Sequence, residues 1–203
     1  NRHRGFFMSS RRITAPELGN LLDRLPPGVK TLSLDCFDTI VWRKVALPTD
    51  VFFHLAQGER WQTAGVTASL RAKAEQEARR LSQLTHGRNE VSIETIYRQL
   101  LPRVDEVELA AWVAEELAAE AEHGFVFEPV RQLIRQAHAR KLRVIVVSDT
   151  YLARPQLRGL LQALLGEDAR LIAQVYCSSE HGQSKAGGLF QPVLQHEKLK
   201  PRQ

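Results

Sequence analysis

Three short apolar runs, each bounded by polar or turn-forming residues, stand out in the pattern of hydrophobic and polar positions. They span residues 31–34, 144–147 and 171–177. Largely apolar runs of this length are typical of strands that are buried on both faces, as in a parallel sheet. Segments with apolar residues at helical spacing lie between the runs, so the pattern predicts an α/β protein with a parallel sheet.

An insertion separates the first two runs. More than a hundred residues lie between Leu34 and Val144, whereas a crossover between parallel strands needs only about a dozen. The excess is predicted to be all-helical, since apolar residues recur there at helical spacing. We therefore assign residues 1–44 and 125–203 to the sheet-containing core and residues 45–124 to the insert. Helices of the insert are expected at residues 50–56, 67–83, 92–101 and 105–123, with Gly124 as a C-cap after the last.

The rest of the core is predicted to place helices between its strands. A short leading helix closes at residues 21–25, because two prolines and a glycine follow it. Further helices are expected at residues 129–140, 153–165 and 188–197.

A different reactive group follows each apolar run. Asp35 ends the first run, Ser148 ends the second, and Lys185 follows the third closely. The carboxyl ends of parallel strands meet at one edge of a sheet, where ligands bind. There a carboxylate could act as a nucleophile, while a hydroxyl and an ammonium bind the oxygens of a substrate. Each residue also has a simpler interpretation: Asp35 in a turn or N-cap, Ser148 capping the next helix, and Lys185 in solvent.

Taken in this order, these residues resemble the haloacid dehalogenase superfamily, whose members place a nucleophilic Asp, a Ser or Thr, and a Lys after successive strands of a Rossmann-like sheet. The resemblance extends over nearly the whole chain. It implies a hydrolase that forms an aspartyl ester on Asp35, with the insert acting as a helical cap over the active site. It also implies a small anionic substrate that is contacted by Thr39, Arg43, Ser148 and Asp149.

One departure from the family concerns the residue two positions after the nucleophile. Phosphatases of the superfamily carry a second Asp there, which protonates the leaving oxygen and then activates water, but this chain has Phe37. Asp38 comes one position later and would point to the other side of an extended strand. The resemblance implies a tight helical turn directly after this strand, which could swing Asp38 back. Dehalogenating members have an aromatic residue at the Phe37 position and Gly at the Asp38 position. Phosphomonoester hydrolysis with Asp38 as the acid is the leading interpretation, because it dominates the superfamily, and 2-haloacid dehalogenation is the alternative.

A second departure lies at the end of the chain. Family members continue into a further strand whose acidic residues hold magnesium in phosphotransferases, and no such strand precedes Gln203. The strand of Asp35 is therefore expected at an open edge of an incomplete sheet, and we expect further residues beyond Gln203, or another segment or chain, to cover it. Asp35 and the backbone carbonyl of Phe37 are the Mg²⁺ ligands that remain, and they would bind the ion weakly. These losses favour a third interpretation, a catalytically silent module that binds a partner or orients an attached enzyme.

A second resemblance concerns the substrate. The segments around Arg71 and Glu75, together with residues 178–182, are similar to a bacterial branch of uncharacterised predicted hydrolases that is often found with surface-polysaccharide glycosyltransferases. This resemblance implies a phosphosugar substrate. The four-residue spacing of Arg71, Glu75 and Arg79 also places them on one helix face, where solvated ion pairs are expected. Arg43 follows a tryptophan and could line the pocket or lie on the surface beside that ring.

Composition narrows the remaining classes of protein. The 203-residue chain has a net charge of +5, but no basic cluster interleaves with aromatic residues, so nucleic-acid binding is not expected. No apolar run is long enough to span a membrane, and the first residues are too few and too polar for a signal peptide. A cytoplasmic location is expected, and the residues before Met8 could be additions to the natural chain. Cys36 and Cys177 are expected to be buried, reduced thiols.

Overall fold

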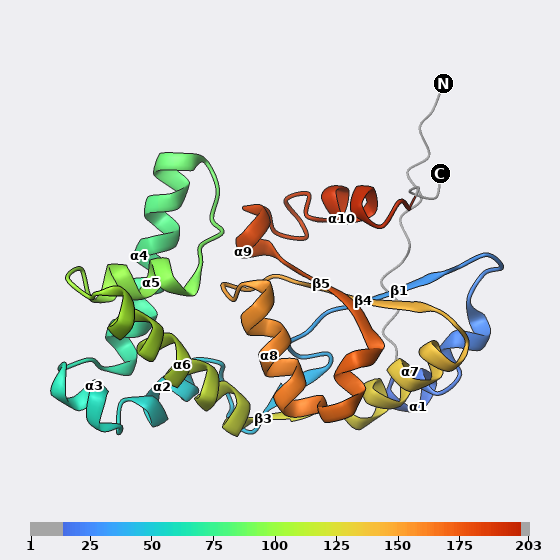
Figure 1. Cartoon of the computed structure of the whole chain (residues 1–203), viewed down its shortest axis with the longest axis horizontal. Coiled ribbons are helices and arrows are strands. Elements are labelled where there is room, and N and C mark those ends of the chain that lie inside the picture. The colour runs from blue at the N-terminus through green and yellow to red at the C-terminus, as the bar shows by residue number, and fades with distance from the viewer. Residues whose placement is uncertain (1–13, 200–203) are drawn as a thin grey trace.

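A parallel sheet of three strands forms the centre of the core in a computed structural model that describes residues 14–199 (Figure 1). The strands are β1 (Thr31–Leu34), β4 (Arg143–Ser148) and β5 (Ile172–Cys177), in the order β1-β4-β5. This arrangement confirms the predicted α/β class. The expectations about a signal peptide and about the residues before Met8 lie outside the described residues.

The register of the sheet brings the ends of its strands together. Leu34 of β1 pairs with Val146 of β4, and Ser148 of β4 pairs with Cys177 of β5. Asp35 therefore leaves the sheet at the edge where Ser148 ends β4. Within residues 14–199, β1 pairs with β4 alone, so the strand of Asp35 is an edge strand of this sheet, as predicted.

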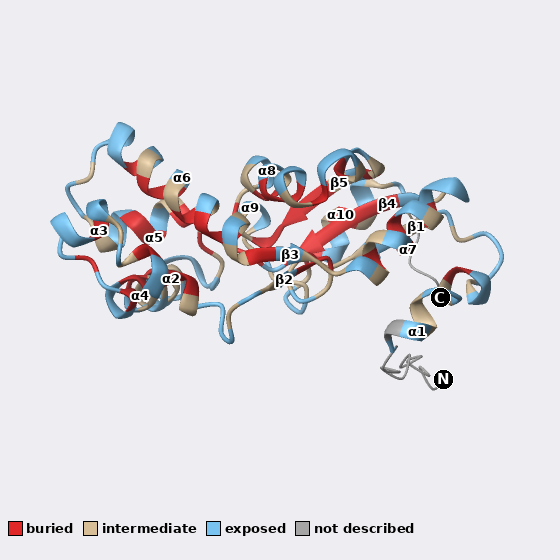
Figure 2. Cartoon of the chain, turned by 90° about the horizontal axis from the view of Figure 1, so that it is seen from below, coloured by how far each residue is buried: buried red, intermediate tan, exposed pale blue. Residues whose placement is uncertain are grey.

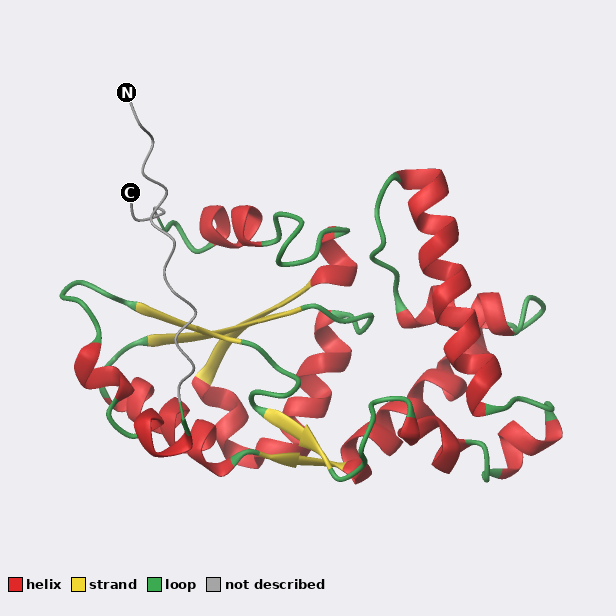
Figure 3. Cartoon of the chain, turned by 180° about the vertical axis from the view of Figure 1, so that it is seen from behind, coloured by secondary structure: helices red, strands yellow, loops and turns green. Residues whose placement is uncertain are grey.

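Helices cover both faces of the sheet, and the apolar strand residues alternate between the two faces. Val144 and Val146 belong to the main core cluster, which includes residues of α7 (Glu128–Ala139) and α8 (Arg154–Leu165). Ile145 belongs to a second buried cluster, which includes Val193 of α10 (Phe190–His196). Figure 3 shows the sheet from behind between these two layers. Burial on both faces explains why residues 144–147 of β4, the middle strand, are continuously apolar.

The core also contains short helices outside these two layers. They are α1 (Ala15–Leu18), the 3₁₀ helices η1 (Leu21–Arg24) and η2 (Gly166–Leu171), and α9 (Ser178–His181). The expected leading helix is thus divided into α1 and η1. Both cysteines are buried free thiols, as predicted.

A small antiparallel hairpin, which the hydrophobic pattern did not predict, marks the two ends of the insert. It pairs β2 (Val41–Arg43) with β3 (Gly124–Val126). Gly124 is the C-cap of α6, as predicted, but its φ of −82° and ψ of 156° are those of an extended strand rather than of the left-handed conformation that a glycine usually adopts there. A Cβ atom at this position would lie 2.7 Å from the carbonyl oxygen of Glu120. Gly124 is therefore required by close backbone approach.

Five helices between β2 and β3 form a body beside the core, here called the cap (Figure 1). Three of the five begin at side-chain N-caps, supplied by Thr67, Ser92 and Asp105. The short helix α3 was not predicted, and the domain boundaries at residues 44 and 125 stay a prediction. The cap helices are α2 (Asp50–Leu55), α3 (Glu59–Thr63), α4 (Ala68–His86), α5 (Ile93–Leu100) and α6 (Glu106–His123).

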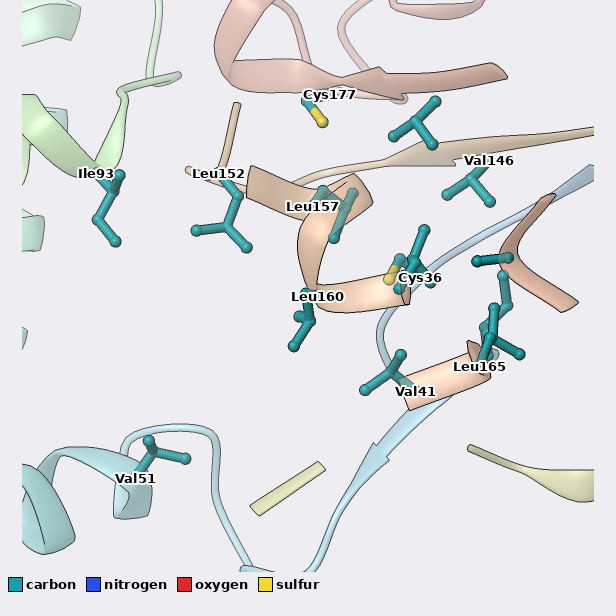
Figure 4. Packing of buried hydrophobic residues seen from close by; sticks show 14 of the residues in the cluster. Cys36, Val41, Val51, Ile93, Val146, Leu152, Leu157, Leu160, Leu165 and Cys177 are labelled. Atoms are coloured by element: carbon teal, nitrogen blue, oxygen red, sulfur yellow. The ribbon is translucent and has the colours of Figure 1, made fainter. Parts of the chain in front are cut away.

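Apolar packing joins the cap to the core. Val51 and Ile93 of the cap belong to the same buried cluster as Leu152 and Leu160 of the core, and Figure 4 shows these side chains around the junction. The buried segments in Figure 2 accordingly run from the sheet into the cap helices. None of the helices within residues 14–199 has the length and apolar character needed to cross a membrane.

The charged stripe of α4 corrects one prediction. Arg79 and Glu75 are partly exposed, as expected, but Arg71 is fully buried and faces Glu116 of α6. The Arg71 guanidinium donates to Glu116 at 2.8 and 2.7 Å, and the Tyr97 hydroxyl donates to the same carboxylate at 2.6 Å. A buried charge needs such partners, so α4 turns this residue toward α6 rather than toward solvent.

Candidate functional site

Asp35 lies directly after β1 with its carboxylate held at both oxygens. Its Oδ1 accepts the backbone N–H of Cys36 at 2.7 Å, and its Oδ2 accepts a hydrogen bond from the ammonium of Lys185. About a third of the Asp35 side chain is exposed (37%), as is a quarter of the Lys185 side chain (26%). The pair is therefore accessible to a small ligand.

Asp149 positions the segment that carries Lys185. The backbone N–H of Lys185 donates to Asp149 Oδ1 at 2.7 Å. This bond joins the residue after β4 to the loop that follows α9, and it directs the lysine toward the end of β1. The structure thus gives Asp149 a supporting role that the sequence did not indicate, and its predicted contact with substrate stays a prediction.

Ser148 has a buried hydroxyl that no described group satisfies. The residue is 1% exposed, and its Oγ has no hydrogen-bond partner within residues 14–199. Most buried polar groups are paired, so an unpaired hydroxyl at a strand end is a candidate for ligand binding. The alternative of a helix cap is not realised, since α8 begins six residues later and its first turn is capped by Gln156, which accepts the N–H of Ala153 at 2.7 Å.

A tight turn follows Asp35, as the resemblance implied. The carbonyl of Cys36 accepts the N–H groups of Ile40 and Val41 at 2.8 and 2.9 Å. Within this turn Asp38 is exposed and has a φ of 56°, in the left-handed region that favours glycine and tolerates aspartate. The backbone thus accounts for the glycine that the resemblance attaches to this position. The half-buried Thr39 lies in the same turn.

Arg43 is held by two neighbours rather than standing free in a pocket. Its Nε and Nη2 donate to Glu120 at 3.0 and 3.3 Å, and both side chains are largely buried. Its guanidinium also lies 4.4 Å from the centre of the Phe37 ring. Burial raises the pKa of the Glu120 carboxyl, and the hydrogen bond from Arg43 opposes that shift. A role for Arg43 in substrate binding stays a prediction.

The carboxylates near Asp35 do not form a magnesium site by themselves. Within residues 14–199, no three His, Cys, Asp or Glu side chains are grouped as ligands for a metal ion. Asp35 Oδ2 is in contact with the Lys185 ammonium, and a carbonyl such as that of Phe37 adds no charge. Mg²⁺ prefers an octahedron of hard oxygen ligands, so the expected pair of Asp35 and the Phe37 carbonyl does not fit the ion as these residues stand.

Two serines that the sequence analysis had not assigned a role fix the loop after Ser148. Ser178 Oγ accepts the N–H of Thr150 at 2.9 Å and donates to its carbonyl at 3.2 Å, while Ser179 Oγ donates to the carbonyl of Leu152 at 2.7 Å. The only signal in the sequence was two hydroxyls directly after an apolar run. Together they hold the ends of β4 and β5 in one arrangement.

The cap also contacts the loop that follows Ser148. The N–H of Ile93 donates to the carbonyl of Tyr151 at 2.9 Å, and Gln156 Nε2 donates to Glu94 at 2.6 Å. The buried Arg71 guanidinium lies 5.1 Å from the centre of the Tyr151 ring. These contacts place the cap helices against the residues that follow Ser148.

Comparison with known proteins finds likeness in structure only. No family model and no curated protein sequence matches the chain. A solved dehalogenase is similar over 88% of this chain and 75% of its own, with 11% identity and a TM-score of 0.53. The L-2-haloacid dehalogenase of Xanthobacter autotrophicus, solved with chloropropionic acid covalently bound, is similar over 86% of this chain and 67% of its own, with 13% identity and a TM-score of 0.53. At such identities the likeness concerns the fold.

Proposed function

Because the chain has the haloacid dehalogenase-like fold, we propose that it is a hydrolase whose nucleophile is Asp35. One observation carries this proposal: Asp35 contacts the ammonium of Lys185 at the sheet edge where the Ser148 hydroxyl is buried without a partner among residues 14–199. The three groups supply a nucleophile, a positive charge and a hydrogen-bond donor. A purely structural role for Asp35 does not require an unpaired hydroxyl at the end of the neighbouring strand.

The leading substrate class is a small phosphomonoester. In the first step a carboxylate oxygen of Asp35 bonds to phosphorus as the bond to the leaving oxygen breaks, and the leaving alkoxide takes up a proton. Lys185 and Ser148 bind the phosphoryl oxygens, whose charge the low-dielectric strand end would otherwise disfavour. Asp38 is the candidate donor of the proton, since it is exposed within the turn that follows Asp35.

In the second step water attacks the phosphorus of the aspartyl phosphate. The bond between phosphorus and the Asp35 oxygen breaks, the carboxylate is restored, and the water loses a proton to the base that Asp38 became in the first step. Dividing one displacement into two lowers each barrier. No residue within 14–199 is assigned to a metal in either step.

A second candidate function is hydrolysis of a 2-haloacid. Phe37, beneath the Arg43 guanidinium, supports it, because halide leaves without a proton and needs no acid at this position. The missing carboxylate cluster within residues 14–199 is compatible with the same reaction. In that case Asp35 bonds to carbon, halide leaves, and water cleaves the resulting ester at its carbonyl carbon.

Parallel assays separate these functions from a silent module. The purified chain is offered p-nitrophenyl phosphate and 2-chloropropionate, with magnesium present, and phosphate and chloride release are measured. We expect phosphate release that is lost in Asp35→Asn and that persists in Arg80→Gln, a surface variant of α4 whose ion pair with Glu77 is exposed. Chloride release alone would select the second function, and no release of either ion would favour the binding module.

A further inference from the structure

Two neighbouring cavities lie between the cap and the segment that leads to Lys185. The first, of about 470 Å³, is walled by α4 and α5 of the cap and by α9 of the core. The second, of about 440 Å³, is walled by residues 86–90 of the cap and by the loop after α9, including Ser184. Figure 3 shows the loop after α4 facing α9 from across the junction. Because Ser184 directly precedes Lys185, the second cavity adjoins the loop that carries Lys185.

Arg88 is shared by both cavities and rests on Gly182 of the core. A Cβ atom on Gly182 would lie 2.9 Å from Arg88 Cδ, so the absence of a side chain at residue 182 leaves the space that Arg88 occupies. Gly182 also has a φ of 64° as the left-handed C-cap of α9, which favours glycine independently. The cap arginine and the core loop are therefore fitted to one another.

Arg88 and Arg103 are the two arginines of the cap for which no hydrogen bond or ion pair is found within residues 14–199. Five other arginines of the cap are each paired with a glutamate, at positions 60, 71, 79, 80 and 98. A planar guanidinium with free donors, placed over a cavity, is suited to two-point binding of a carboxylate or phosphate.

The walls around Arg88 suit a ligand that also carries hydroxyl groups. Thr95 and Gln99 of α5 line the first cavity, and Glu90 lines both. Glu180 of α9 also lines the first cavity. These carboxylates repel a second anion at their own positions and accept hydrogen bonds from hydroxyls. An anionic group is thus favoured at Arg88 alone, with hydroxyls beside it.

We propose that Arg88 binds a second anionic group of the substrate, remote from the group that Asp35 attacks, and so selects polyhydroxylated substrates with a negatively charged leaving group. The proposal rests on the proposed function of Asp35 for the position of the reacting group. Arg88, a residue of the cap, would thus distinguish leaving groups that are equal in size and differ in charge.

Calorimetric binding tests this assignment without turnover. The ligands are 3-phosphoglycerate and glycerol 3-phosphate, which share a three-carbon skeleton and differ by one carboxylate. They are titrated into Asp35→Asn protein, which cannot consume them, and into the same protein carrying Arg88→Gln or, as the matched control, Arg80→Gln. We expect 3-phosphoglycerate to bind about tenfold more tightly than glycerol 3-phosphate, Arg88→Gln to abolish that preference, and Arg80→Gln to preserve it.

Three results would overturn the assignment: equal affinity for the two ligands, no binding of either ligand, or a preference that survives Arg88→Gln. The proposed function is judged separately, from turnover of both ligands by the protein with Asp35 intact. If the preference depends on Arg88 and neither ligand is hydrolysed, the site at Arg88 stands and the hydrolase proposal fails.

Discussion

Arg71 of α4 and Glu116 of α6, which are 45 residues apart, form a two-point ion pair inside the cap. Neither side chain reaches solvent, with exposures of 0% and 1%. The guanidinium also lies 4.6 Å from the centre of the Phe52 ring, and Tyr97 donates its hydroxyl to the same carboxylate. Since Arg71 also faces Tyr151 of the core, the pair joins two cap helices to the loop that follows Ser148.

Removing one partner of this pair should be costly. Arg71→Met leaves the Glu116 carboxylate buried without its counterion, and we expect the free energy of unfolding to fall by about 3–5 kcal/mol. Replacing both residues, as Arg71→Met with Glu116→Leu, should restore part of that loss because no charge is then buried. Urea unfolding measures both effects. Arg80→Met, which breaks an exposed pair, should change stability by less than about 1 kcal/mol; an equal loss there would contradict a special role for the buried pair.

Asp168 should make stability depend on pH at the acid end. Hydrogen bonds from Arg135 and Arg131 hold the pKa of the Asp168 carboxyl below its usual value. The folded state therefore releases this proton at lower pH than the unfolded chain, whose value is about 3.9, so the stabilisation is complete above that value and is lost as pH falls below it. Asp168→Asn should cost about 1 kcal/mol at pH 7, since the pair is screened by solvent.

The measurement for Asp168 is urea unfolding at neutral and acid pH. The difference between Asp168→Asn and the unsubstituted protein should narrow below about pH 4, where the unfolded carboxyl is protonated. A difference that widens on acidification would have the wrong sign for a depressed pKa and would contradict the arrangement.

Both thiols should be unreactive in the folded protein. Cys36 and Cys177 are fully buried, and burial raises the pKa of the Cys177 thiol to about 12 and that of Cys36 further. Thiolate is the reactive form, so Ellman's reagent at pH 8 should label neither residue in buffer and both in guanidinium chloride. Rapid labelling of the folded chain would show that one of these strand ends is open.

Asp38 should matter most for poor leaving groups. Asp38→Asn keeps a residue that tolerates the left-handed backbone but removes the proposed acid. We expect kcat for an alkyl phosphate to fall by about 10²–10⁴-fold, and that for p-nitrophenyl phosphate to fall less, because nitrophenolate leaves without a proton. Unfolding measurements provide the control for stability. Equal kinetics of the two proteins on both substrates would exclude Asp38 as the acid.

The elements that could be predicted from sequence are those whose causes are local. Asp35, Ser148 and Lys185 each follow an apolar run, and the rules of parallel sheets bring the ends of such runs together. The contact between Lys185 and Asp35, 150 residues apart, agrees with that expectation. The turn after Asp35 was also expected, but the left-handed φ of Asp38 within it could not be predicted from the sequence.

The elements that could not be predicted depend on partners distant in the sequence. The spacing of Arg71, Glu75 and Arg79 is the same whether the helix face meets water or α6, and Glu116 carries no local signal of its role. Gly124 ends α6 as predicted, but its extended backbone and the close approach of the Glu120 carbonyl could not be predicted, because a glycine that ends a helix is usually left-handed. Strands of three residues, such as β2 and β3, are too short to show the alternation of polar and apolar residues by which a strand is predicted.

Acid-quenched single turnover with p-nitrophenyl phosphate, followed by peptide mapping by mass spectrometry, tests the role of Asp35 most directly. The expected result is one phosphoryl group on the peptide that contains Asp35, formed before phosphate is released and absent from Asp35→Asn protein. Phosphate release without any phosphorylated peptide, or with the phosphoryl group on another residue, would contradict nucleophilic attack by Asp35.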